Sequence, residues 1–164
     1  MTTFMLALAF CIPLTISVNA VEIEPGFPTD CGIPTVKREI KEIAEKRKNR
    51  AIKHGFPWHA GLFSMHLAKH PFCGGTLISD SLVLTVAHCI QIFLGCTRVP
   101  VGTEFAVDEK TSNLLFVLLG AHNFRDNNGM EQLLTVDRVI VHPNYNQDNT
   151  LEGTDLAILK LSNR

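Results

Sequence analysis

From residue 56 onward, short apolar runs alternate with polar and turn-forming residues. Runs of this kind are typical of strands with one face in a core. They predict six strands, over residues 60–67, 75–78, 83–87, 114–119, 133–141 and 156–161. Turn signals such as Asn127-Asn128-Gly129 and His142-Pro143-Asn144 separate some of these runs. Six short strands joined by turns predict an all-β fold, namely a small β-barrel.

The first twenty residues have a different pattern. Residues 5–12 form an apolar core without charge, and Val18-Asn19-Ala20 offers a cleavage site, as in a secretory signal peptide. The basic segment that usually precedes such a core is missing. The alternative interpretation is a membrane anchor. Pro13 and the short apolar run argue against that alternative. We expect cleavage near Val21, no membrane segment after signal removal, and secretion into an oxidising, extracellular compartment.

Residues 21–55 are expected to form a linker. Residues 21–36 are rich in Pro and Gly, which indicates a loop or an extended segment. Residues 37–53 hold eight Lys or Arg and three Glu, and they form only a thin apolar stripe. This segment is expected to be a charged helix or a disordered arm.

Composition narrows the class of protein. A chain of 164 residues has room for one domain, and its formal net charge of −1 gives no reason to expect nucleic-acid binding. Of the five cysteines, Cys11 would leave with the signal peptide. The other four would enter an oxidising compartment, where disulfides are expected and four free thiols are not.

Two stretches carry the chemistry. Residues 72–79 read Phe-Cys-Gly-Gly-Thr-Leu-Ile-Ser, and residues 84–89 read Leu-Thr-Val-Ala-His-Cys. Residues 153–161 read Gly-Thr-Asp-Leu-Ala-Ile-Leu-Lys-Leu. These stretches resemble the surroundings of the catalytic histidine and aspartate in the trypsin-like serine proteases, which have the chymotrypsin fold. Residues 56–58, 119–123 and 139–145 add to the resemblance, which covers residues 56–161.

The resemblance implies a fold and two site residues. The fold would be the first six-stranded barrel of the two that make up a chymotrypsin-like domain. His88 would be the general base, and Asp155 the carboxylate that orients it. In this chemistry the imidazole removes a proton from a serine hydroxyl, and the buried carboxylate fixes the tautomer of the imidazole.

The resemblance also implies a disulfide between Cys73 and Cys89. Cys31 lies where related proteases carry a propeptide cysteine, whose usual partner would lie beyond Asp155. Cys96 has no partner in the family pattern. Pairing of Cys31 with Cys96, an odd thiol and an intermolecular bond all remain open.

Three departures from the family pattern matter for function. No Gly-Asp-Ser-Gly-Gly motif occurs, so the nucleophile and its oxyanion hole are missing. Basic sites such as Arg47 and Arg50 precede Ala51-Ile52, but no Ile-Val-Gly-Gly-like terminus follows them. Ala121 replaces a carboxylate in the loop that resembles a calcium loop, although Asp126 and Glu131 remain. We therefore expect no metal or other cofactor.

Two function classes follow. The first is a secreted trypsin-like serine endopeptidase, truncated before the nucleophile and inactive as this chain, with residues 1–20 as signal peptide, 21–55 as propeptide-like linker and 56–164 as partial protease domain. Its partners would be protein or peptide substrates once a second barrel completes it. The alternative is a non-catalytic homologue that binds proteases, substrates or inhibitors.

Overall fold

A computed structural model describes residues 32–34, 36, 51–95, 98–108, 110–111, 113–123 and 129–162. The predicted signal peptide, most of the predicted linker with its basic cleavage sites, and one ligand of the calcium-like loop lie outside the described residues. The same holds for Cys31 and Cys96.

The described part of the chain consists mainly of strands. Its elements are β1 His59–Phe63, β2 Cys73–Leu77, β3 Leu82–Thr85, α1 Ala87–Phe93, β4 Glu104–Ala106, β5 Phe116–Leu119, β6 Gln132–Val141, the 3₁₀ helix η1 Thr150–Glu152, and β7 Ala157–Leu161. In the segments described, no helix has the length and apolar character that crossing a bilayer requires.

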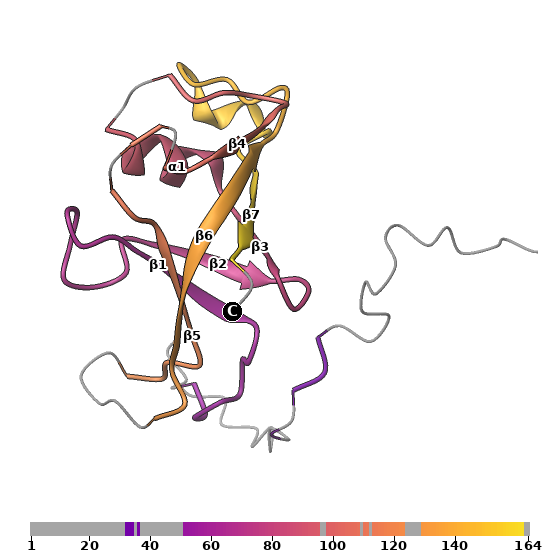
Figure 1. Cartoon of the computed structure of the whole chain (residues 1–164). Coiled ribbons are helices and arrows are strands. Elements are labelled where there is room, and N and C mark those ends of the chain that lie inside the picture. The colour runs from indigo at the N-terminus through magenta and orange to yellow at the C-terminus, as the bar shows by residue number, and fades with distance from the viewer. Residues whose placement is uncertain are drawn as a thin grey trace, which may run out of the picture.

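Six of these strands close into an antiparallel barrel in the order β1-β2-β3-β7-β6-β5, with β5 pairing back onto β1. The prediction of an all-β six-stranded barrel is therefore confirmed. The short strand β4 pairs with β6 outside this ring, and sequence reasoning missed it. Figure 1 shows α1 and η1 near one end of the barrel, where β4 also lies.

The long strand β6 closes the barrel because it pairs with two other strands of the ring, β5 and β7. Residues 132–135 pair with β5, whereas residues 136–141 pair with β7. The register shifts between Val136 and Arg138, which marks a β-bulge. Bulges of this kind bend a strand and increase its twist, and β6 can thereby follow the curved wall (Figure 1).

Alternate side chains of the strands fill the barrel. In β7, for example, Ala157, Leu159 and Leu161 are buried, whereas Lys160 is exposed. Helix α1 adds side chains at one end of this core. The core residues are Ala60, Leu62, Val83, Ala87, Cys89, Ile90, Phe93, Val99, Phe105, Val107, Leu115, Val117, Leu119, Val136, Val139, Val141, Tyr145, Ala157, Leu159 and Leu161.

Two strand predictions extended too far. The strand predicted over 60–67 ends at Phe63, because the next residues turn: the Ser64 carbonyl accepts hydrogen bonds from the amides of Leu67 and Ala68. The strand predicted over 83–87 ends at Thr85, and Ala87 begins helix α1 instead. Three of the buried residues of this helix, Ala87, Ile90 and Phe93, are spaced three apart, a helical spacing that the preceding apolar run obscured.

The adjacent glycines of β2 meet different surroundings. A methyl group on Gly75 would lie 2.8 Å from Cγ1 of Val83 and 3.0 Å from the Leu84 carbonyl oxygen. A methyl group on Gly74 would meet nothing closer than the Ala60 carbonyl oxygen, at 3.9 Å. The close approach of β2 to β3 therefore requires glycine at the second position only.

Gly75→Ala is expected to lower the free energy of unfolding by about 2 kcal/mol, because the added methyl group overpacks the barrel. Gly74→Ala is the matched control on the same strand and is expected to change it by less than about 0.5 kcal/mol. Urea unfolding of the two variants measures the difference. Equal effects would show that the contact of Gly75 with β3 does not limit the packing.

Candidate active site

The pairing of β3 with β7 brings the two predicted site residues together. Thr85, the last residue of β3, pairs with Ala157, the first residue of β7. Because the strands are antiparallel, residues that follow Thr85 run beside residues that precede Ala157. His88 lies three residues after Thr85, and Asp155 lies two residues before Ala157. The barrel register thus places these two side chains side by side.

Asp155 first satisfies a backbone group at the start of helix α1. Val86 precedes the helix in an extended conformation and offers no side-chain cap. The first amides of a helix have no partner within the helix. Here the His88 amide donates to Oδ1 of Asp155 over 2.8 Å. The carboxylate therefore fixes the helix start, and with it the position of the His88 side chain.

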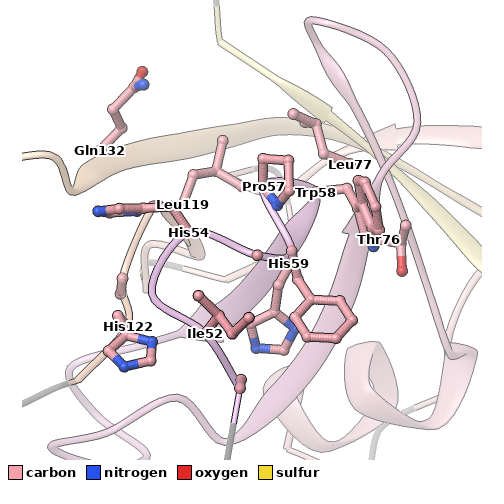
Figure 2. Close-up of a pocket in the computed structure, with 15 residues that line it drawn as sticks. Ile52, His54, Pro57, Trp58, His59, Thr76, Leu77, Leu119, His122 and Gln132 are labelled. Carbon is pink, nitrogen blue, oxygen red and sulfur yellow. The ribbon is translucent and has the colours of Figure 1, made fainter. Parts of the chain in front are cut away.

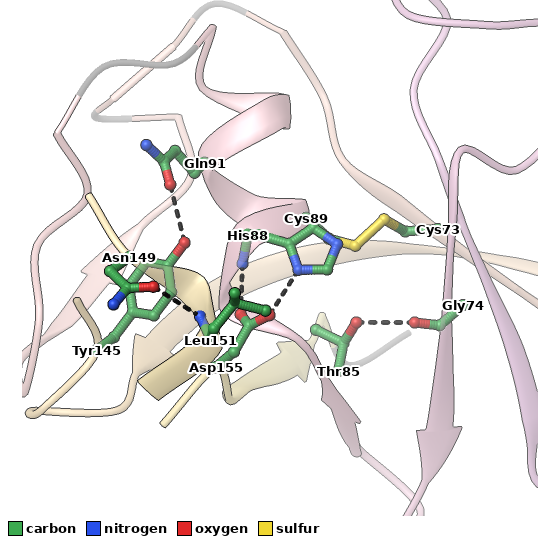
Figure 3. Close-up of polar contacts among 10 residues, drawn as sticks. All are labelled: Cys73, Gly74, Thr85, His88, Cys89, Gln91, Tyr145, Asn149, Leu151 and Asp155. Atoms are coloured by element: carbon green, nitrogen blue, oxygen red, sulfur yellow. Dashed lines mark hydrogen bonds and ion pairs between the residues drawn. A yellow bond between two sulfur atoms is a disulfide. The ribbon is translucent and has the colours of Figure 1, made fainter. Parts of the chain in front are cut away.

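The second oxygen of Asp155 contacts the imidazole itself. Oδ2 lies 2.6 Å from Nδ1 of His88, and Figure 3 shows both contacts of the carboxylate. An ionised carboxylate only accepts hydrogen bonds, so Nδ1 carries the proton in this contact. In the neutral ring, Nε2 then keeps its lone pair. The Asp155 side chain is 19% exposed and that of His88 is 44% exposed, so the ring can receive a proton from outside the barrel.

A disulfide joins Cys73 of β2 to Cys89 of α1, with their Cα atoms 6.2 Å apart, as the family resemblance implies. It links the helix that carries His88 to the neighbouring strand. Nearby, the Thr85 hydroxyl donates to the Gly74 carbonyl over 2.8 Å. The strand pair and the start of the helix are therefore held by a covalent bond and by a partly buried hydrogen bond (Figure 3).

The segment before Asp155 has its own local anchors. The Asn149 side chain accepts from the Leu151 amide and caps η1, and Gly153 ends η1 in a left-handed conformation with φ of 81°. The Thr154 hydroxyl donates to the Asn144 carbonyl over 2.6 Å. These contacts fix the direction from which the carboxylate approaches His88.

Tyr145 connects this segment to helix α1. Its ring is buried, and its hydroxyl donates to Oε1 of Gln91 over 2.8 Å (Figure 3). Burial and, to a smaller degree, the negative charge of Asp155 raise the pKa of the Tyr145 hydroxyl above its ordinary value of 10.0. Sequence reasoning noted Tyr145 only as part of a motif. The contact joins residues far apart in the chain, and no local pattern indicates it.

The Tyr145 hydroxyl favours the neutral form in the folded state, so its contribution to stability is complete below pH 10 and is lost as the pH rises through the folded-state pKa. Tyr145 is the single tyrosine of the chain. The absorbance of tyrosinate is therefore expected to appear at higher pH in the folded protein than in urea. Tyr145→Phe is expected to cost about 1 kcal/mol at neutral pH, through the lost bond to Gln91. Appearance of the tyrosinate absorbance at the same pH in the folded protein and in urea would contradict the burial of the Tyr145 hydroxyl.

No described serine is hydrogen-bonded to His88 in the role of a nucleophile. Ser64 is buried, and its hydroxyl donates to the Leu114 carbonyl while contacting Nδ1 of His66 at 2.7 Å. Its single proton is thus used within the fold. The remaining described serines bond to nearby turns or strands, and they are Ser79, Ser81 and Ser162.

A separate pocket of about 700 Å³ lies against residues 51–59. Figure 2 shows its lining, which includes Trp58, His54, His59 and His122. Neither His88 nor Asp155 is among its lining residues. The pocket is therefore not part of the histidine–aspartate site, and the three histidines do not form one of the close ligand groups found among the described residues.

Comparison with known proteins indicates which family the chain is similar to. The family model described as Trypsin matches residues 46–164. Chymotrypsin-like elastase family member 1 of Felis catus is 33% identical over 134 residues, which are 80% of this chain and 41% of that protein. The Bos taurus protein of the same name is 36% identical over 91 residues, 55% of this chain and 27% of that protein.

Mannan-binding lectin serine protease 1 of Mus musculus is 34% identical over 133 residues, which are 80% of this chain and 18% of that protein. The chain thus spans less than half the length of each of these relatives. Its closed barrel has the form expected for the first half of a chymotrypsin-like domain. With the family match over residues 46–164, these findings show that the chain belongs to the trypsin family of serine proteases, whose N-terminal half it resembles.

Proposed function

We propose that this chain supplies the general base and the orienting carboxylate of a serine endopeptidase, namely His88 and Asp155. The observation that carries the proposal is the double contact of one carboxylate, with the His88 amide and with Nδ1 of its ring. That contact leaves Nε2 as the basic atom. A conventional surface histidine has no such partner holding both its backbone and its ring.

The chemistry follows from the tautomer. A serine hydroxyl placed against Nε2 of His88 would transfer its proton there as its oxygen attacks the peptide carbonyl carbon. Asp155 stays ionised and stabilises the imidazolium that forms. His88 then delivers the proton to the leaving amine. The resulting acyl-enzyme is hydrolysed by water, with the same imidazole as base.

The nucleophile would come from outside these 164 residues, because no Gly-Asp-Ser-Gly-Gly motif occurs among them. We therefore expect residues 21–164 to show no amide hydrolysis by themselves. The substrates proposed are proteins or peptides, in keeping with the family. A proposed division of the chain has a signal peptide over 1–20, a linker over 21–55 and the protease part over 56–164.

Secretion belongs to the proposal as well. The Cys73–Cys89 disulfide is of a kind that persists in oxidising compartments, and residues 5–12 provide the apolar core of a signal peptide. Expression of the full chain in a secreting cell, followed by sequencing of the secreted product from its N-terminus, tests this. A product that stays inside the cell with Met1 intact would contradict secretion.

A hybrid of this chain and a relative, called the complemented protein below, tests the proposed activity. Residues 56–162 would replace the matching part of the Felis catus elastase relative, which matches this chain over 134 residues. That relative would keep its own N-terminal segment and everything beyond the matched region. The expected result is hydrolysis of a peptide amide by the complemented protein and none by residues 21–164. A folded but inactive complemented protein would contradict the proposal and would favour the non-catalytic, binding homologue.

A further inference from the structure

The Cys73–Cys89 disulfide lies directly beside the imidazole of His88. One ligand atom from each of Cys73, Cys89 and His88 lies within 4.8 Å of the others. In Figure 3 the sulfur bridge is on the side of the ring away from Asp155. The two sulfur atoms are now bonded to each other. As thiolates, together with the imidazole nitrogen, they would be a donor set that suits zinc.

The contact with Asp155 completes the setting of a metal-binding histidine. Asp155 holds Nδ1 of His88, so Nε2 is the nitrogen available to a metal. Histidines that bind metals usually donate their other ring N–H to a carboxylate or carbonyl, which fixes the ring and raises its basicity. His88 already has that partner in Asp155, and a metal bound to Nε2 would leave the contact between Asp155 and Nδ1 in place.

We propose that two-electron reduction of the Cys73–Cys89 disulfide creates a zinc site formed by the two thiolates and Nε2 of His88. A dithiol reductant supplies the electrons and two protons, and it closes to its own cyclic disulfide. Binding of Zn²⁺ then releases the two thiol protons. Three protein ligands leave a fourth, tetrahedral position for water.

The distances suit this change. Zinc bonds of about 2.3 Å to sulfur and about 2.0 Å to nitrogen place tetrahedral ligand atoms roughly 3.5 to 3.8 Å apart. That spacing lies inside the 4.8 Å that now encloses the two sulfur atoms and one ring nitrogen of His88. Breaking the sulfur–sulfur bond lets the two sulfur atoms separate to this spacing, so modest side-chain rotations are enough.

The elements that carry the ligands have other connections besides the disulfide. Cys73 is in β2, which pairs with both β1 and β3. Cys89 is 1% exposed in a helix whose start is held by Asp155. The strand and the helix that carry the ligands are therefore still held by other contacts when the disulfide opens.

One consequence rests on the proposed function. Zinc would bind through the lone pair of Nε2, which is the same electron pair that the proposed proton transfer uses. Reduction in the presence of zinc would then prevent His88 from accepting a proton. Oxidation would release the metal and restore His88 as a base. The metal site itself rests on the geometry alone, and metal binding can be measured without any activity.

The experiment uses the full chain with Cys11, Cys31 and Cys96 changed to Ser, so that the remaining thiols are the two proposed ligands. The protein is reduced with a dithiol, freed of reductant without oxygen, and titrated with Zn²⁺ and with Co²⁺, whose thiolate charge-transfer and d–d absorption reports ligand type and geometry. Circular dichroism follows the fold. We expect one tetrahedral metal per chain when reduced and none when oxidised.

Variants separate the proposed site from chance binding. His88→Ala is expected to weaken Zn²⁺ binding by more than tenfold, and Asp155→Asn by about tenfold through its effect on the ring. His122→Ala, which removes an exposed histidine, is the matched control and is expected to change nothing. Equal affinities for the His88 and His122 variants would overturn the proposal, as would an unfolded chain at saturating zinc.

Discussion

In the complemented two-barrel protein, His88→Ala is expected to lower kcat by roughly 10⁶-fold, the scale of loss known when the base of a serine triad is removed. The reason is the geometry of one tautomer: Asp155 occupies Nδ1 at 2.6 Å, and Nε2 is left as the proton acceptor. An alanine leaves no proton acceptor for the serine hydroxyl. The measurement is single-turnover and steady-state hydrolysis of a peptide amide.

Asp155→Asn is expected to cost about 10⁴-fold in kcat, because an amide at this position favours the wrong tautomer of the ring. KM is expected to change little, since neither side chain is proposed to hold the substrate. His122→Ala is the matched control and should leave kcat within twofold. A His88→Ala protein that keeps a tenth or more of the activity would assign the base to another residue.

Removal of the Cys73–Cys89 disulfide is expected to lower the free energy of unfolding by about 3 kcal/mol. The two cysteines are 16 residues apart in sequence, and closing a loop of that length restricts the unfolded chain by about this amount. Cys73→Ala with Cys89→Ala removes the bond without leaving a thiol. Urea unfolding of the double variant and of the parent chain measures the loss.

Variants of two other cysteines provide the control for this prediction. Changing Cys31 and Cys96 to Ser leaves the Cys73–Cys89 bond in place and serves as the background for the double variant. Reduction of that background should reproduce most of the loss in the absence of metal. A loss below about 1 kcal/mol would mean that the strand pairing and the hydrogen bond of Thr85 to Gly74 already hold the helix.

Local sequence pattern predicted most of the barrel. Each of the six predicted runs overlaps a strand of the closed ring. The reason is that buried and more exposed side chains alternate along such runs, as in residues 157–161. β4 was missed because Glu104–Ala106 is too short to show alternation. Helix α1 was missed because its apolar residues continue directly from β3, and tertiary contact rather than periodicity decides where the strand ends.

The site could be predicted only in part. The motifs around His88 and Asp155 indicated both residues, but their contact depends on the register of β3 against β7, which no local pattern specifies. The use of Asp155 as partner for the His88 amide was likewise not visible in the sequence. The bond from Tyr145 to Gln91 joins residues that lie far apart in the chain, and no local pattern indicates it.

The most direct test of the account is the tautomer of His88, measured by nitrogen-15 NMR of the folded chain at a pH where the ring is neutral. Free imidazole side chains favour a proton on Nε2. The contact with Asp155 predicts the opposite, a proton on Nδ1, and its loss in Asp155→Asn. A His88 ring with its proton on Nε2, unchanged in Asp155→Asn, would contradict the proposed role of this pair.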